Sequence, residues 1–135
     1  MSRRKSRIIA FQALYSWDVG KEPLEELLKF QWVEDKNEEE ELTFSRLIIA
    51  GTIEHIDEID DLIKKNLSPK WDFERLSRVT VSILRISIFS ILYQKETHES
   101  IIIDEAIDIA KEFGPDDSYK FINAMLDNIS KQKRC

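Results

Sequence analysis

The fold is decided by residues 78–93, which read RVTVSILRISIFSILY and are apolar on nearly every side. An alternating strand is possible locally, but the length of the run favours a helix. A helix that is apolar all round is buried inside a protein. The stretch therefore predicts a central helix around which other elements pack. Arg85 stands alone within it, and is compatible equally with a paired arginine at the rim of the core and with a functional role.

Helical spacing of apolar residues continues on the N-terminal side of this segment. It predicts a helix over about Arg3–Trp17, capped by Ser2, and a short second helix that starts near Pro23. After an acidic stretch, a long periodic segment covers about Glu39–Leu67. That segment either stays continuous or breaks once near Gly51, because glycine weakens a helix interior.

The C-terminal side predicts two more helices. The first covers Ile101–Phe113 and stops at a Gly-Pro pair, and the second runs from Asp116 or Asp117 to about Ser130. Only three glycines and three prolines occur in 135 residues, and these are few turn-forming residues for an all-β chain. We therefore predict an all-α protein.

Charge is unevenly distributed along the chain. The first seven residues carry four positive charges and no negative one, although the net charge is −6. Setting aside these four cations and the three within residues 131–134 leaves residues 8–130 with a charge of −13. A body this acidic repels nucleic acid, so the basic leader indicates either a localised anion-binding spot or a solubilising tail. The leader occupies the end of its helix that the macrodipole disfavours for cations, which hints at an external anion.

The sequence contains none of the usual catalytic constellations. Neither His55 nor His98 follows a glutamate at the Glu-x-x-His spacing, and no Cys-x-x-Cys pair or glycine-rich phosphate loop occurs. The one cysteine, Cys135, excludes an internal disulfide and fits a reducing cytosol. No apolar run approaches the roughly 20 residues that cross a bilayer, and no signal peptide is evident. We expect a cytoplasmic protein that is not an enzyme and uses no metal or cofactor.

The sequence therefore indicates a binding function. The first predicted helix offers four cations followed by an amide and an aromatic ring: Arg3, Arg4, Lys5, Arg7, Gln12 and Tyr15. Cations hold phosphates without reading sequence, whereas an amide and a ring can hydrogen-bond and stack on unpaired bases. This combination favours single-stranded RNA over duplex DNA. A helix-turn-helix DNA reader places its cations on a recognition helix, but the interior helices here are acidic or apolar.

Three motifs follow one another along the chain. The first joins the basic leader to Phe11-Gln-Ala-Leu-Tyr-Ser-Trp17, the second is Trp71-Asp-Phe-Glu-Arg-Leu76 with Ile83-Leu-Arg85, and the third covers Asp104–Asn123, with Leu126-Asp127 after it. In this order, and in a chain of this length, they resemble the NusB family of bacterial transcription antitermination factors over essentially the whole sequence.

The resemblance implies about seven helices in one domain, arranged as two small packed halves of about residues 1–68 and 69–135. It implies binding of the boxA element of ribosomal RNA leader transcripts together with the ribosomal protein NusE. The RNA polymerase antitermination complex would then read through terminators in rRNA operons. By position, the RNA surface would include the six residues of the first helix and also Asp117, Lys120, Phe121 and Asn123. Arg85 lies in the motif near which NusE is expected to bind.

The chain departs from the family pattern at several positions. Tyr119 replaces a histidine, Ala124 a glycine, Asp104 an asparagine and Thr80 an acidic residue. Thr80 matters most, because it removes a carboxylate that could face the partner. Two other functions stay open: an accessory RNA-binding domain related to rRNA cytosine methyltransferases, and a helical protein-interaction adaptor without RNA specificity. A homodimer that covers the RNA face is also compatible with the sequence.

Overall fold

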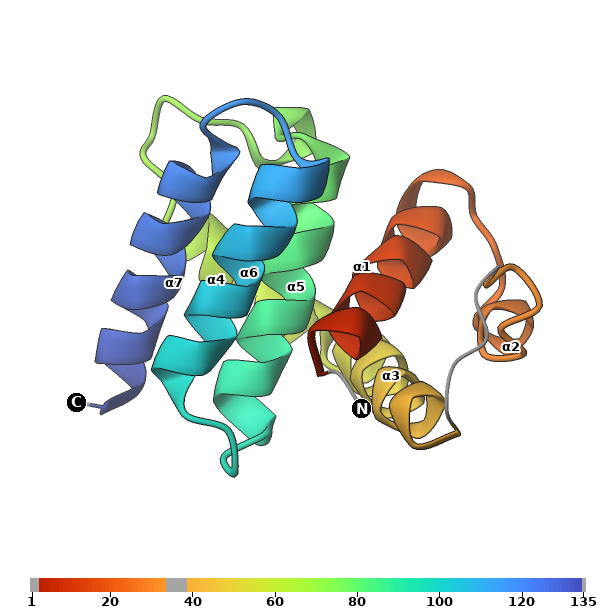
Figure 1. The fold of residues 1–135 in the computed structure, drawn as a ribbon. Helices are drawn as coiled ribbons and strands as arrows, with labels where there is room; N and C mark the ends of the chain where they lie inside the picture. Colours follow the sequence, from red (N-terminus) through yellow and green to blue (C-terminus); the bar gives the residue numbers. More distant parts are fainter. Residues whose placement is uncertain (1–2, 34–38, 135) are drawn as a thin grey trace.

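The protein is entirely helical over the residues that its computed structural model describes, which are 3–33 and 39–134. These residues form seven α-helices and one short 3-10 helix (Figure 1): α1 Arg3–Val19, α2 Leu24–Leu27, α3 Glu39–Glu54, α4 Ile56–Lys65, η1 Phe73–Arg75, α5 Arg78–Tyr93, α6 Glu99–Phe113 and α7 Ser118–Arg134. The all-α prediction is confirmed. The expected cap at Ser2 and most of the acidic stretch before α3 lie outside the described residues.

Helix α5 is the centre of the molecule and has the predicted bounds. Every residue from Thr80 to Ile91 is buried, because α1, α3, α4, α6 and α7 all pack against this helix. Its N-terminus is capped by the hydroxyl of Ser77, which accepts a hydrogen bond from the Thr80 amide at 3.3 Å. Figure 1 shows α5 between the α6–α7 pair on one side and α1 with α3 on the other.

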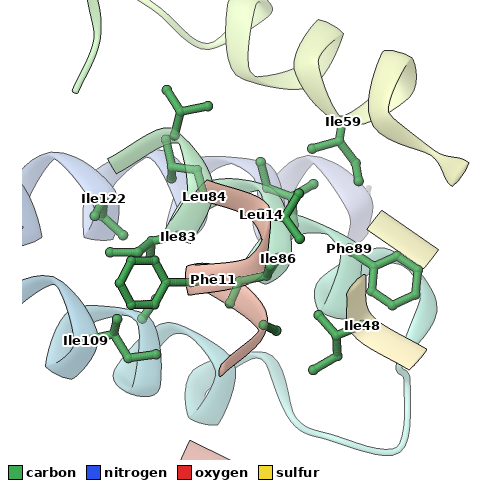
Figure 2. Close-up of a cluster of buried hydrophobic side chains, with 14 of the residues drawn as sticks. Phe11, Leu14, Ile48, Ile59, Ile83, Leu84, Ile86, Phe89, Ile109 and Ile122 are labelled. Carbon is green, nitrogen blue, oxygen red and sulfur yellow. The ribbon is translucent and has the colours of Figure 1, made fainter. Parts of the chain in front are cut away.

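Helix α1 is held by the same core. Figure 2 shows Phe11 and Leu14 of α1 among aliphatic side chains of α5, with Ile109 of α6 and Ile122 of α7 nearby. All four of these side chains are buried. Burying each one contributes about 1.5–3 kcal/mol relative to leaving it in water, so the core fixes α1 firmly against α5.

The long periodic segment breaks at His55, one turn after Gly51, and becomes α3 and α4. Gly51 itself stays helical, and its carbonyl accepts the His55 amide at 3.1 Å. A Cβ atom at residue 51 would overlap the ring of Phe89. The glycine therefore permits close approach of α3 to α5. The break follows at His55, whose ring stacks on Tyr93 with 4.2 Å between ring centroids.

Other element boundaries differ modestly from the predicted ones. Helix α6 starts at Glu99 rather than Ile101, since the ring of His98 caps it by accepting a hydrogen bond from the Ser100 amide at 3.1 Å. Helix α7 continues past Ser130 to Arg134. None of the helices in the described part of the chain is long and apolar enough to span a membrane.

Candidate nucleic-acid interface

Two side-chain contacts join the basic helix α1 to the last turn of α6. The guanidinium of Arg4 reaches Glu112 in the last turn of α6, with 2.8 Å between Nη2 and Oε1. The rings of Phe11 and Phe113 lie 5.2 Å apart. Tyr15 follows Phe11 by one helical turn and is 37% exposed, so it lies on the same side of α1. Arg4 and Phe11 thus face the last turn of α6, and Tyr15 lies on the same side of α1 as Phe11.

The segment after α6 reaches the same place from the other side. The ring of Tyr119, in the first turn of α7, lies 4.8 Å from the ammonium nitrogen of Lys111 and 6.0 Å from that of Lys120. Lys120 also pairs with Asp117 at 3.6 Å. Asp117 adopts a left-handed backbone conformation with φ of 64°, which reverses the chain between the two helices. The fold therefore brings Arg4 of α1 and Tyr119 of α7 to opposite edges of the last turn of α6.

Most of the predicted RNA-binding side chains are at least partly accessible. Arg3 is exposed, and its guanidinium carbon lies 3.8 Å from the centroid of the Phe44 ring. The half-buried ones are Arg4, Lys5, Gln12 and Phe121, and the exposed ones include Asp117, Lys120 and Asn123. We call these residues, with Arg3 and Tyr15, the candidate RNA surface.

The structure corrects the prediction that Arg7 belongs to the RNA-binding surface. Its side chain is only 2% exposed and donates from Nη1 to Glu105 of α6 at 2.9 Å. Burial lowers the pKa of the Arg7 guanidinium, and the neighbouring Glu105 carboxylate partly offsets that effect. The guanidinium still stays charged at neutral pH, because the ordinary arginine pKa is so high. Arg7 therefore anchors α1 to α6 and has no access to a phosphate in this structure.

Arg85 is buried as well, so the second correction concerns its partner role. Its guanidinium makes two parallel hydrogen bonds to Asp60 of α4, each 2.9 Å long. A third nitrogen lies 3.5 Å from Asp18 of α1, which also accepts a hydrogen bond from Arg78 at 2.8 Å. The sequence was compatible with a paired arginine or a functional one at this position, and the structure confirms that Arg85 is paired. At 5% exposure, Arg85 offers almost no surface to a partner.

Sequence reasoning missed the exposed aromatic residue next to Phe121. The indole of Trp71 is 58% exposed, and its ring centroid lies 6.0 Å from that of Phe121. The two rings line an open groove of about 290 Å³ together with Arg75, Thr80 and Ser118. Trp71 was visible as part of the second motif, but exposure of its ring depends on how the loop before η1 packs. Thr80, the departure from the family pattern, lines this groove and is buried.

The arrangement defines a class: small all-helical proteins in which a basic N-terminal helix and a C-terminal helix pair pack on opposite sides of a central buried helix. A solved structure of NusB from T. maritima has the same fold. It superposes with a TM-score of 0.89 at 35% identity, and the match covers 98% of this chain and 92% of the other. A second similar structure, at 28% identity and a TM-score of 0.85, is of the antitermination factors NusB and NusE in complex with double-stranded RNA, with 98% and 99% of the two chains covered.

The sequence comparison agrees with the structural one. The sequence model of the NusB family matches residues 4–131. The transcription antitermination protein NusB of Treponema denticola is 48% identical over 137 aligned residues, which cover 98% of both chains. This chain belongs to the NusB family of transcription antitermination factors.

Proposed function

We propose that the protein binds the single-stranded boxA element of ribosomal RNA leader transcripts together with the ribosomal protein NusE. In the cytoplasm, it would thereby help the RNA polymerase antitermination complex to read through rRNA operons. The observation that carries the proposal is that Arg4 of α1 and Tyr119 with Lys120 of α7 meet at the last turn of α6. The relative that was solved with NusE and RNA supports the same pairing of partners.

The candidate RNA surface contains two kinds of binding group, cations and aromatic rings. Arg3 and Arg4 supply a grip on phosphates that does not depend on sequence. The Arg4–Glu112 pair is solvent-exposed on both sides, and such pairs contribute only about 0–1 kcal/mol. A phosphate can therefore replace the Glu112 carboxylate at little cost. Tyr15 and Phe121 offer rings on which unpaired bases can stack, and the acidic body repels the rest of the strand.

The NusE contact needs residues other than Arg85, because that side chain is buried. Trp71 and Arg75 belong to the same middle motif and are exposed. They lie beside Phe121, which belongs to the candidate RNA surface. A partner that occupies this groove would touch the protein and the bound RNA at once, which explains how NusE could strengthen RNA binding.

Replacing both Arg3 and Arg4 by alanine should flatten the salt dependence of RNA binding. If the protein contacts three to five phosphates, the slope of log affinity against log salt is about −2 to −3.5 for a single strand, and each lost contact removes about 0.7. The double variant should thus have a slope shallower by about 1.4. A matched control changes Lys65 and Lys95, both exposed and outside the surface. Salt-insensitive binding by the wild-type protein would contradict the basic anchor.

Replacing Phe121 by leucine should weaken RNA binding by about 1–3 kcal/mol, the usual contribution of one stacked base. Leucine keeps apolar packing against the core but removes the aromatic face. The loss should be the same at every salt concentration, because no charge changes. Tyr93→Leu removes an exposed ring elsewhere on the molecule and is the control. Wild-type affinity in a folded Phe121→Leu variant would show that this ring does not stack.

The specificity of the proposed function is tested by titrating a boxA-like RNA, a scrambled RNA of the same length and a duplex, each with and without NusE. We expect the boxA-like strand to bind best and NusE to widen the difference. Equal affinity for the boxA-like and scrambled strands in the presence of NusE would overturn the proposal. It would favour the adaptor function or the accessory RNA-binding function that the sequence left open.

A further inference from the structure

We propose that Lys111 binds an RNA phosphate and joins the two edges of the candidate RNA surface, so that the strand crosses α6 at its last turn. The inference rests on the proposed function and assigns a residue that the motif analysis left out. It follows from the position of Lys111 between α1 and α7, and from the distribution of charge along the outer face of α6.

Lys111 occupies the gap between the two edges. The next residue, Glu112, holds Arg4 of α1 at 2.8 Å. On the other side, the ammonium of Lys111 lies 4.8 Å from the ring of Tyr119, whose other neighbour is Lys120. Successive residues of a helix point about 100° apart, so Lys111 faces the α7 side while Glu112 faces α1. Cations from α1, α6 and α7 thus follow one another around the C-terminus of α6.

The rest of the outer face of α6 disfavours RNA. Asp108 and Asp104 are exposed and lie about one and two turns before Lys111, on the same side of the helix. Carboxylates in these positions repel a phosphate chain, whereas Lys111 attracts one. A strand that touches both α1 and α7 therefore meets a cation of α6 only at Lys111, beside Glu112, whose carboxylate pairs with Arg4.

A lysine in the last turn of a helix also has a purely structural use, since a cation stabilises the negative end of the helix macrodipole. Lys65 serves as a matched control, because it too is an exposed lysine in the last turn of its helix, α4. Replacement by glutamine removes the same charge and the same helix-end interaction at both positions. Only the Lys111 variant should lose a phosphate contact.

The test compares Lys111→Gln, Lys111→Arg and Lys65→Gln by fluorescence anisotropy with a labelled boxA-like single strand, in the presence of NusE and over a series of salt concentrations. We expect Lys111→Gln to bind about threefold to fivefold more weakly and to lose about 0.7 from the salt slope. The loss should be similar for the scrambled strand, because phosphate contacts do not read bases. Lys111→Arg should keep the wild-type slope, and thermal unfolding of all three variants shows whether the fold is retained.

The proposal is overturned if folded Lys111→Gln keeps the wild-type slope, or if Lys65→Gln loses as much as Lys111→Gln does. It is also overturned if Lys111→Arg fails to restore the slope while remaining folded. Failure of the proposed function gives a different result. In that case the wild-type protein itself would not distinguish the boxA-like strand from the scrambled one.

Discussion

Replacing Arg85 by methionine is expected to lower the free energy of unfolding by about 3–5 kcal/mol, the usual cost of removing one partner from a buried ion pair. Methionine fills a similar volume, so the loss comes from charge. Asp60 would keep its carboxylate in a largely buried position without the two hydrogen bonds that now neutralise it. Asp18 would retain Arg78. Urea unfolding at neutral pH measures the effect.

Two companion variants make this expectation specific. Arg75→Met removes an arginine whose side chain is 88% exposed, and it should change stability by no more than about 0.5 kcal/mol. Adding Asp60→Asn to the Arg85→Met variant should recover part of the loss, because the unpaired charge is removed with its partner. A loss below about 1 kcal/mol for Arg85→Met would mean that the ion pair does not hold α4, α5 and α1 together.

Replacing Arg7 by methionine is the second large effect, and it should appear in stability rather than in RNA binding. Its removal leaves Glu105 facing the core, which we expect to cost about 3 kcal/mol. The salt slope of RNA binding should stay at the wild-type value, because the buried guanidinium of Arg7 touches no phosphate.

Arg4→Met, on the same helix, should show the reverse pattern. Its pair with Glu112 is exposed, so stability should fall by at most about 1 kcal/mol. The salt slope should become shallower by about 0.7. Urea unfolding and salt titration of the two variants side by side separate the anchoring arginine from the binding one. A shallower slope for folded Arg7→Met would return Arg7 to the RNA surface.

The different roles of Arg4 and Arg7 could not be predicted from the sequence. Arg4 and Arg7 are the same residue type, one helical turn apart, and the pattern of the leader gave no reason to separate them. The difference lies in Glu105 and Glu112, which stand about one hundred positions later in the chain. No local spacing can indicate which of two arginines becomes buried against a carboxylate of a distant helix.

The candidate site shows the same limit in its aromatic part. Phe121 belongs to the third motif and Trp71 to the second, but nothing in the sequence indicates that the two rings lie 6.0 Å apart. Likewise, Lys111 lies inside the third motif, but its proposed role depends on contacts that only the fold creates. Its ammonium group lies close to the ring of Tyr119, and the next residue, Glu112, pairs with Arg4. The described structure supplied these juxtapositions, and the RNA-binding roles themselves stay predictions.

The sequence by itself determined the helices, including the bounds of α5, because a helix is a local structure whose apolar spacing, caps and breakers lie within a few residues of one another. It also determined that the protein is all-α and that a cluster of cations without any acidic residue stands at the start of the chain. Only the tertiary structure decided which cations are free to bind and which are buried in ion pairs. The physical reason is that burial and charge pairing depend on side chains from distant helices, which come together only when the core around α5 forms.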